Sequence, residues 1–224
     1  MTDERHSATQ RFYDRISHVY DLIADAGEHE AREKGLAALH ARPGERILEI
    51  GFGTGHSLVD LATAVGSTGH VSGVDIAPKM RDVAQHRVTK ESLADRIDLS
   101  VAAIPPLPYD DAAFDGVFLS FVLELFPLVE IVGVLREIDR VLRPGGRVCV
   151  VSMATTRDDE SDSFLEKTYK WLHHHFPHIV DCQPIDVVNK VRAAGYDDVE
   201  ETRMDIWTLP VATVVGWKPA AGSP

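Results

Sequence analysis

Two kinds of apolar pattern alternate along the middle of this chain. Continuous apolar runs, typical of buried strands, cover residues 46–51, 70–75, 97–103, 114–123 and 147–153. Between them lie segments whose apolar positions return every three or four residues, typical of helices, at 56–66, 77–93 and 128–142. Strands that alternate with helices predict a parallel sheet covered by helices on both faces.

The two ends of the chain follow other patterns. Residues 1–42 have apolar residues at helical spacing and end at Pro43-Gly44, which predicts an N-terminal helical segment. After the fifth strand we expect helices near 161–176 and 184–195. Two closing strands at 197–206 and 210–217 are joined by a short link, which favours an antiparallel hairpin at the sheet edge. The pattern therefore predicts a seven-stranded, mostly parallel, doubly wound Rossmann-like α/β sheet with a C-terminal antiparallel hairpin.

Composition narrows the class of protein. The 224 residues suit a single globular unit, and 44% hydrophobic with 26% charged residues is typical of soluble domains. A net charge of −12 argues against nucleic acid as the main partner. The longest apolar stretch is interrupted by Glu124, Pro127 and Glu130, so we expect no membrane span. A polar N-terminus without a signal-peptide core and only two cysteines favour the cytoplasm.

The first predicted strand ends in a carboxylate and three glycines. The stretch "ILEIGFGTGHS", from Ile47 to Ser57, joins a strand to a helix through a glycine loop, which is typical of a nucleotide site. The spacing is G-x-G-x-G, with His56 where a dinucleotide fingerprint has its third glycine. Asp75, at the end of the second strand, is placed to accept hydrogen bonds from ribose hydroxyls. A dinucleotide site also uses such an acid, and a glycine loop alone can be an ordinary tight turn.

Four segments resemble the successive motifs of class I S-adenosylmethionine-dependent methyltransferases. They are "ILEIGFGTG", "VSGVDIAPKM", "LPYDDAAFDGVFLSFVLELF" and "LREIDRVLRPGGRVCVV", which together span roughly residues 46–151. The branch that they resemble includes the ubiquinone/menaquinone-biosynthesis C-methyltransferases. The resemblance implies S-adenosyl-L-methionine as the cofactor, S-adenosyl-L-homocysteine as the product, and a cofactor-binding domain at 43–224 behind an N-terminal helical lid at 1–42.

The resemblance also assigns a part of the cofactor to each matched position. It implies that Gly51, Gly53 and Gly55 wrap the methionine half and that Glu49 lies just beneath it. Asp75 would hold the ribose. Ile76 and Met80 would flank adenine. The backbone of Ala103 and Ile104 would support adenine where the family typically has an acidic residue. Ser120 would lie at the methyl-transfer site.

The acceptor side offers three candidate catalytic residues, His18, Tyr20 and Glu124, with Tyr13 as a further pocket residue. The N-terminal "FYDRISHVYDLI" resembles the lid helix of this family, so Tyr13 and Tyr20 are expected to line the acceptor cavity, with His18 as a candidate base. Glu124 is a carboxylate among apolar neighbours just after the fourth strand, where burial would raise its pKa and suit it to be a base. Core packing for Tyr20 and an exposed helix cap for Glu124 remain alternatives.

A histidine-rich stretch, "WLHHHFPHIVDC", invites a metal hypothesis. Adjacent histidines point in different directions on a helix, and Pro177 disrupts the turn that would bring His174 and His178 onto one face. We therefore expect no metal. We expect a pocket wall instead, with His174, His178 and Cys182 on the acceptor side.

We therefore expect an S-adenosylmethionine-dependent methyltransferase that acts on a small-molecule acceptor by in-line transfer, with family analogy favouring a quinone-type ring carbon. A thiol, amine, phenol or lipid headgroup is the alternative acceptor. From other classes, an NAD-linked reductase and a non-catalytic cofactor-binding module remain open. A homodimer is compatible with these expectations.

Overall fold

Seven strands form one sheet in the computed structural model, which describes residues 27–155, 184–206, 209–220 and 222. The strands are β1 (Arg46–Ile50), β2 (His70–Asp75), β3 (Ile97–Val101), β4 (Phe114–Ser120), β5 (Leu142–Met153), β6 (Asp197–Ile206) and β7 (Leu209–Trp217). Their order in the sheet is β3-β2-β1-β4-β5-β7-β6. The first five strands pair in parallel, and β7 runs antiparallel to both β5 and β6. The predicted sheet and its antiparallel hairpin are confirmed.

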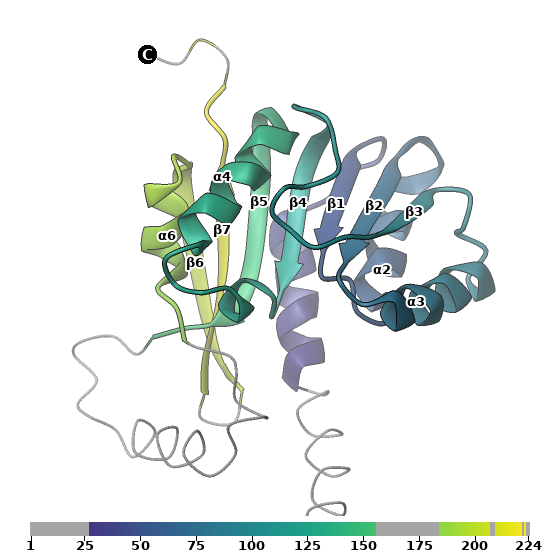
Figure 1. Ribbon diagram of the computed structural model, residues 1–224, viewed down its shortest axis with the longest axis horizontal. Coiled ribbons are helices and arrows are strands. Elements are labelled where there is room, and N and C mark those ends of the chain that lie inside the picture. Colours follow the sequence, from purple (N-terminus) through teal and green to yellow (C-terminus); the bar gives the residue numbers. More distant parts are fainter. Residues whose placement is uncertain (1–26, 156–183, 207–208, 221, 223–224) are drawn as a thin grey trace, which may run out of the picture.

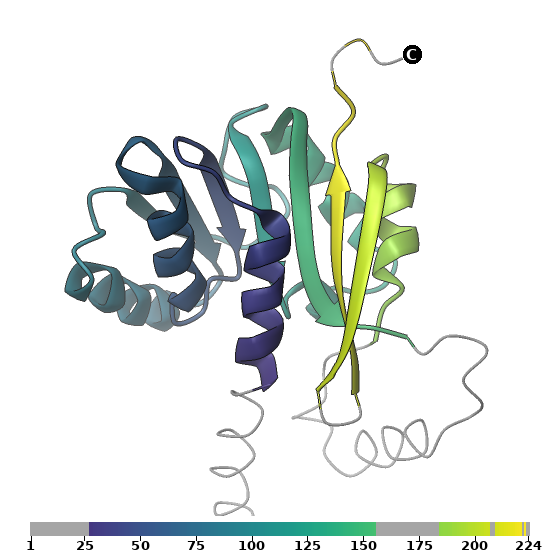
Figure 2. The same cartoon turned by 180° about the vertical axis from the view of Figure 1, so that it is seen from behind.

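Helices cover both faces of the sheet, as Figures 1 and 2 show. One face carries α4 (Ile131–Val141) and α6 (Val187–Ala193). The other carries α2 (His56–Val65), α3 (Pro78–Lys90) and an N-terminal helix at residues 27–39. Two short 3-10 turns, η1 (Gly66–Thr68) and η2 (Leu123–Leu125), complete the described elements.

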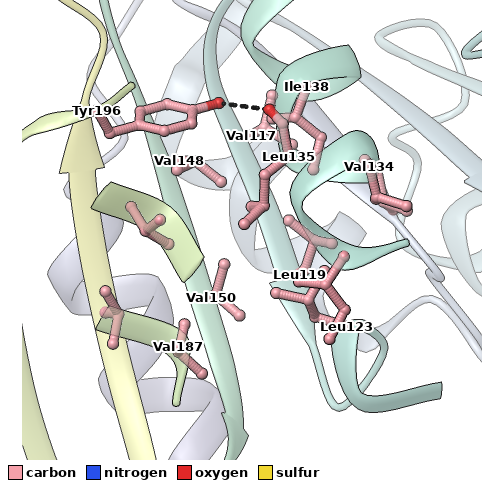
Figure 3. Close-up of a cluster of buried hydrophobic side chains, with 14 of the residues drawn as sticks. Val117, Leu119, Leu123, Val134, Leu135, Ile138, Val148, Val150, Val187 and Tyr196 are labelled. Carbon is pink, nitrogen blue, oxygen red and sulfur yellow. Dashed lines mark hydrogen bonds between the residues drawn. The ribbon is translucent and has the colours of Figure 1, made fainter. Parts of the chain in front are cut away.

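The core under α4 follows from the spacing of its apolar residues. Five buried residues, three or four positions apart for the most part, form one face of this helix: Ile131, Val134, Leu135, Ile138 and Val141. They pack on strand residues such as Leu119 and Val148 (Figure 3). The Tyr196 hydroxyl donates a hydrogen bond to the Leu135 carbonyl oxygen at 3.2 Å, so its polar end is satisfied within the core. This face serves stability and holds the fourth and fifth strands in place.

The N-terminal helix is fixed tightly against the opposite face. A Cβ atom added at Gly35 would collide with Val151 and Phe118, so this helix packs closely on the sheet. Arg147, which is buried, donates hydrogen bonds to the Leu39 and His40 carbonyl oxygens and pairs with Glu45 at 2.7 Å. These contacts hold the helix in a fixed position relative to the sheet.

Several element boundaries differ from the predicted ones: β5 begins at Leu142 instead of residue 147, for example, and α6 begins at Val187 instead of residue 184. The fourth strand ends at Ser120, three residues early, where Phe121 adopts a left-handed backbone angle, φ 55°, outside the extended region of a regular strand. Helix α4 begins at Ile131, later than the predicted residue 128. The helix expected near 161–176 lies outside the described residues. The division into a lid at 1–42 and a domain at 43–224 stays a prediction.

Candidate functional site

The glycine loop turns the chain from β1 into α2. The Gly51 amide donates to the Val74 carbonyl oxygen at 2.7 Å, which extends the β1–β2 pairing by one residue. The Gly55 amide donates to the Phe52 carbonyl oxygen at 2.9 Å and closes the turn. Gly51, Gly53 and Gly55 all have positive φ, at 72°, 50° and 80°, which is the left-handed region that favours glycine. The turn therefore requires glycine-like backbone angles at each of these positions.

The three glycines differ in what surrounds them. A Cβ atom at Gly51 would collide with Val122, and one at Gly55 would crowd Ala84 of α3. A Cβ atom at Gly53 would meet nothing within 4 Å. Gly51 and Gly55 therefore allow close packing of the loop, whereas Gly53 faces open space beside the cavity described next.

A cavity of about 560 Å³ opens where β1, β2 and β4 end, and this volume is in the range of small-molecule sites. Ligands of doubly wound sheets bind at this edge. The cavity is lined by Glu28, Arg32, Glu49, Ile50, Gly51, Phe52, Gly53, Thr54, His56, Ser57, Val74, Asp75, Ile76, Ala102, Ile104, Ser120, Phe121, Val122, Leu125 and Phe126. It thus brings together predicted cofactor residues from three of the four motifs, and Ile104 from the segment that follows β3.

Asp75 supports the glycine loop from the end of β2. One carboxylate oxygen accepts a hydrogen bond from the Gly53 amide at 2.9 Å, and the other accepts from the Ala77 amide at 2.8 Å. Each carboxylate oxygen can accept further bonds, so two hydroxyl groups could still bind this side chain. Asp75 can therefore hold a ribose and shape the loop at the same time.

Glu49 is a buried carboxyl group on the cavity wall. It is 3% exposed, and the Ser57 side chain forms a hydrogen bond with it. Its Oε2 atom has no hydrogen-bond partner among the described residues. Burial raises the pKa of Glu49 to about 8. A buried acceptor without a partner, facing a cavity, suits a ligand that brings a hydrogen-bond donor.

The N-terminal helix adds two charged residues that sequence reasoning missed. Glu28 and Arg32, four positions apart and hence on one face of the helix, both line the cavity. The Arg32 guanidinium lies 2.7 Å from His29 Nδ1, and its buried Nε atom has no partner among the described residues. Helical spacing was the only signal in the sequence that could have paired them. Arg32 places a cation opposite the buried Glu49 carboxyl group, which interacts with it electrostatically.

Of the four residues predicted to lie beside adenine, two line the cavity and two do not. Ile76 and Ile104 line the cavity, and Ile76 is 71% exposed. Met80 and Ala103 are not among the lining residues, whereas Ala102 is. An exposed apolar side chain at the cavity rim would be covered by a flat ring such as adenine.

Apolar residues form the wall next to the end of β4. Ser120 lines the cavity there, together with Phe121, Val122, Leu125 and Phe126. Glu124, in the same turn, is not among the lining residues and is 2% exposed. Its Oε1 accepts from the Met153 amide at 3.3 Å, and its Oε2 has no partner among the described residues. Burial is the largest cause of the raised pKa of Glu124, and the nearby Glu28 adds to it.

Six predicted acceptor-side residues lie outside the described residues: Tyr13, His18, Tyr20, His174, His178 and Cys182. Their roles stay predictions. Within residues 27–155, 184–206 and 209–220, no group of three or more histidine, cysteine or acidic side chains could hold a metal ion. The described helices are also too short or too polar to cross a bilayer.

The sequence matches known methyltransferases. A family described as "Methyltransferase domain" matches residues 47–146. The demethylmenaquinone methyltransferase of Symbiobacterium thermophilum is 34% identical over 153 residues, covering 66% of this chain and 60% of the relative. The enzyme of the same name from Halalkalibacterium halodurans is 31% identical over 202 residues, covering 88% of this chain and 76% of the relative. The chain thus spans about three fifths to three quarters of these relatives.

The fold matches solved structures as well. A S-adenosylmethionine-dependent methyltransferase from Aquifex aeolicus superposes with a TM-score of 0.60 at 19% identity, covering 82% of this chain and 88% of that one. At this identity the likeness concerns the fold alone.

Proposed function

Because the chain belongs to the S-adenosylmethionine-dependent methyltransferases, we propose that it transfers a methyl group from S-adenosylmethionine to a small-molecule acceptor. The observation that carries this proposal is the cavity at the strand ends, where Glu49 and Asp75 lie beside the open face of Gly53. The family assignment favours a methyltransferase over an NAD-linked reductase.

The charged residues of the cavity suit this cofactor. S-adenosylmethionine carries two positive groups, the sulfonium and the amino group, and one carboxylate. The cavity is lined by three acidic residues, Glu28, Glu49 and Asp75, and by the guanidinium of Arg32. We expect Glu49 to bind the amino group and Arg32 the carboxylate, because each contact joins opposite charges. We expect Asp75 to accept hydrogen bonds from the ribose hydroxyls.

The chain itself contributes mainly alignment to the reaction. When bound, S-adenosylmethionine supplies a methyl group activated by a positively charged sulfur. The glycine loop, Asp75 and Ser120 would orient the methionine end toward the apolar wall formed by Phe121, Val122 and their neighbours. Holding two reactants in line without intervening water can contribute about 7–11 kcal/mol to lowering the barrier. No covalent intermediate with the protein is required.

We propose a quinone-type ring carbon as the methylated atom, which the names of the relatives support. A quinone ring is electron-poor, so its reduced quinol form is the chemically competent nucleophile. A new carbon–methyl bond forms, the sulfur–methyl bond breaks, and the ring carbon loses a proton. Thiols, amines, phenols and lipid headgroups remain the alternative acceptors.

Glu124 is our candidate for the group that takes up this proton. It is buried and precedes Leu125 of the apolar wall in the sequence, and burial raises its pKa above the ordinary value of a carboxyl group, which is the direction expected for a base. Glu124→Gln should lower kcat by about 100-fold or more while S-adenosylhomocysteine binds unchanged. A normal kcat in this variant would show that Glu124 is not the base and serves only the structure, through its hydrogen bond with the Met153 amide.

The direct test is turnover with purified protein. S-adenosylmethionine is incubated with a short-chain demethylated naphthoquinol, a thiol, an amine or a phenol, and S-adenosylhomocysteine formation is measured. We expect turnover with the quinol. Turnover confined to another acceptor would replace the quinol assignment, and absence of turnover together with absence of S-adenosylmethionine binding would refute the proposed function.

A further inference from the structure

We infer that binding of the cofactor at Glu49 releases a proton from this side chain, so that Glu49 acts as a proton-coupled receptor for the amino group. The inference rests on the proposed function, because it takes the amino-acid end of S-adenosylmethionine as the ligand of this carboxyl group. It adds a pH dependence of binding that the methyltransferase reaction itself does not require.

The geometry begins with the two oxygen atoms of Glu49. One side of the carboxyl group is occupied by the hydrogen bond with Ser57 at the start of α2. The other oxygen, Oε2, is buried and has no partner among the described residues, although the side chain lines the cavity. A buried polar atom without a partner costs free energy, so a donor supplied by a ligand would relieve that cost.

Ionisable groups surround Glu49 on three of the elements packed around it. The N-terminal helix contributes Arg32 and Glu28 to the cavity, α2 contributes His56 and Asp60, and β2 contributes Asp75. From β4, the lining residue at the cavity is Ser120, which is uncharged. Arg32 favours the ionised form of Glu49, whereas Asp60 and Asp75 oppose it. Removal from water is the largest of these effects and keeps the carboxyl group protonated at neutral pH.

The amino group of the ligand changes this balance. A protonated amine placed at Oε2 favours the carboxylate over the neutral acid, because opposite charges attract strongly in a site removed from water. Glu49 then gives its proton to the solvent, and one ion pair replaces one neutral acid and one free ammonium. A ligand without the amino group, such as 5′-methylthioadenosine, leaves Glu49 protonated and releases nothing.

Two quantities follow from a pKa of about 8 in the free protein. At pH 7 most of the molecules carry the proton, so binding should release most of one proton per ligand. Between pH 6 and pH 7 the affinity for S-adenosylhomocysteine should rise about tenfold, since each molecule must lose one proton to bind. In Glu49→Gln both effects should vanish.

The experiment is calorimetric titration of the full-length protein with S-adenosylhomocysteine at pH 7, in two buffers of low and high ionisation enthalpy. The difference in observed heat gives the number of protons released. The same titration is run with 5′-methylthioadenosine on the wild type and with S-adenosylhomocysteine on Glu49→Gln. The wild-type comparison of the two ligands needs no substitution, so it holds even if the variant folds poorly.

We expect most of one proton for S-adenosylhomocysteine with the wild type, and close to none for 5′-methylthioadenosine or for Glu49→Gln. Tight binding of S-adenosylhomocysteine without proton release would overturn this inference and leave the proposed function intact. Equal proton release by both ligands would also overturn it, because the proton would then not depend on the amino group. A wild type that binds neither ligand would refute the proposed function.

Discussion

A substitution at Gly53 can distinguish an effect on stability from an effect on ligand binding. The Gly53 φ of 50° favours glycine, yet an added Cβ atom would meet nothing within 4 Å. Gly145 has the same two properties, with φ 74° and open space around its Cβ position. It lies at the start of β5, opposite the edge that carries the cavity. The pair Gly53→Ala and Gly145→Ala is therefore matched in backbone cost and differs in position.

The expected magnitudes follow from these contacts. Left-handed backbone angles cost an alanine about 1–2 kcal/mol, which lowers the melting temperature of a chain of this size by about 2–8 °C in either variant. At Gly53 the added methyl group also enters the ligand space. Overpacking of that kind costs about 1–3 kcal/mol, or roughly 5- to 150-fold in affinity.

Calorimetry with S-adenosylhomocysteine and a thermal melt of each variant provide the assay. We expect both variants to lose stability to a similar extent, and only Gly53→Ala to lose affinity by fivefold or more. Equal affinity of the two variants would refute the reasoning that Gly53 faces the ligand. A much larger loss of stability in Gly53→Ala alone would show that this position serves the fold.

Three further predictions concern charged side chains. Between pH 4.5 and 8, Glu49 is protonated in the folded protein but ionised in the unfolded chain, so the free energy of unfolding should fall as the pH rises through this range. The fall due to Glu49 should be up to about 5 kcal/mol, and urea titrations of Glu49→Gln should lack it. Asp75→Ala should weaken S-adenosylhomocysteine binding tenfold or more by calorimetry, because it removes a charged acceptor and frees the Gly53 amide. Arg147→Met leaves Glu45 buried without its partner and should lower the free energy of unfolding by about 3–5 kcal/mol in urea titrations; an unchanged midpoint would contradict this.

Much of the fold could be predicted because its signals are local. Apolar runs and three- to four-residue spacing identify strands and helices, and their alternation restricts the topology to a parallel sheet. The antiparallel hairpin followed from the short link near Leu209-Pro210. The end of β4 could not be predicted, because the left-handed angle of Phe121 is unusual for a bulky residue and no glycine at this position signals it.

The site was less predictable than the fold. Glu49, Gly53 and Asp75 lie on motifs with fixed spacing, and the structure brings them to one cavity. Glu28 and Arg32 reach the same cavity from a helix that precedes every motif, and only the packing of that helix on the sheet reveals it. Spacing also did not distinguish the roles of the glycines, since Gly55 packs against α3 whereas Gly53 faces open space.

Equilibrium dialysis with methyl-labelled S-adenosylmethionine tests most directly whether the cavity at the ends of β1 and β2 holds this methyl donor. We predict that the full-length protein retains about one equivalent of label per chain, that S-adenosylhomocysteine displaces it, and that NAD does not. Absence of retained label, or its displacement by NAD at similar concentration, would contradict the account.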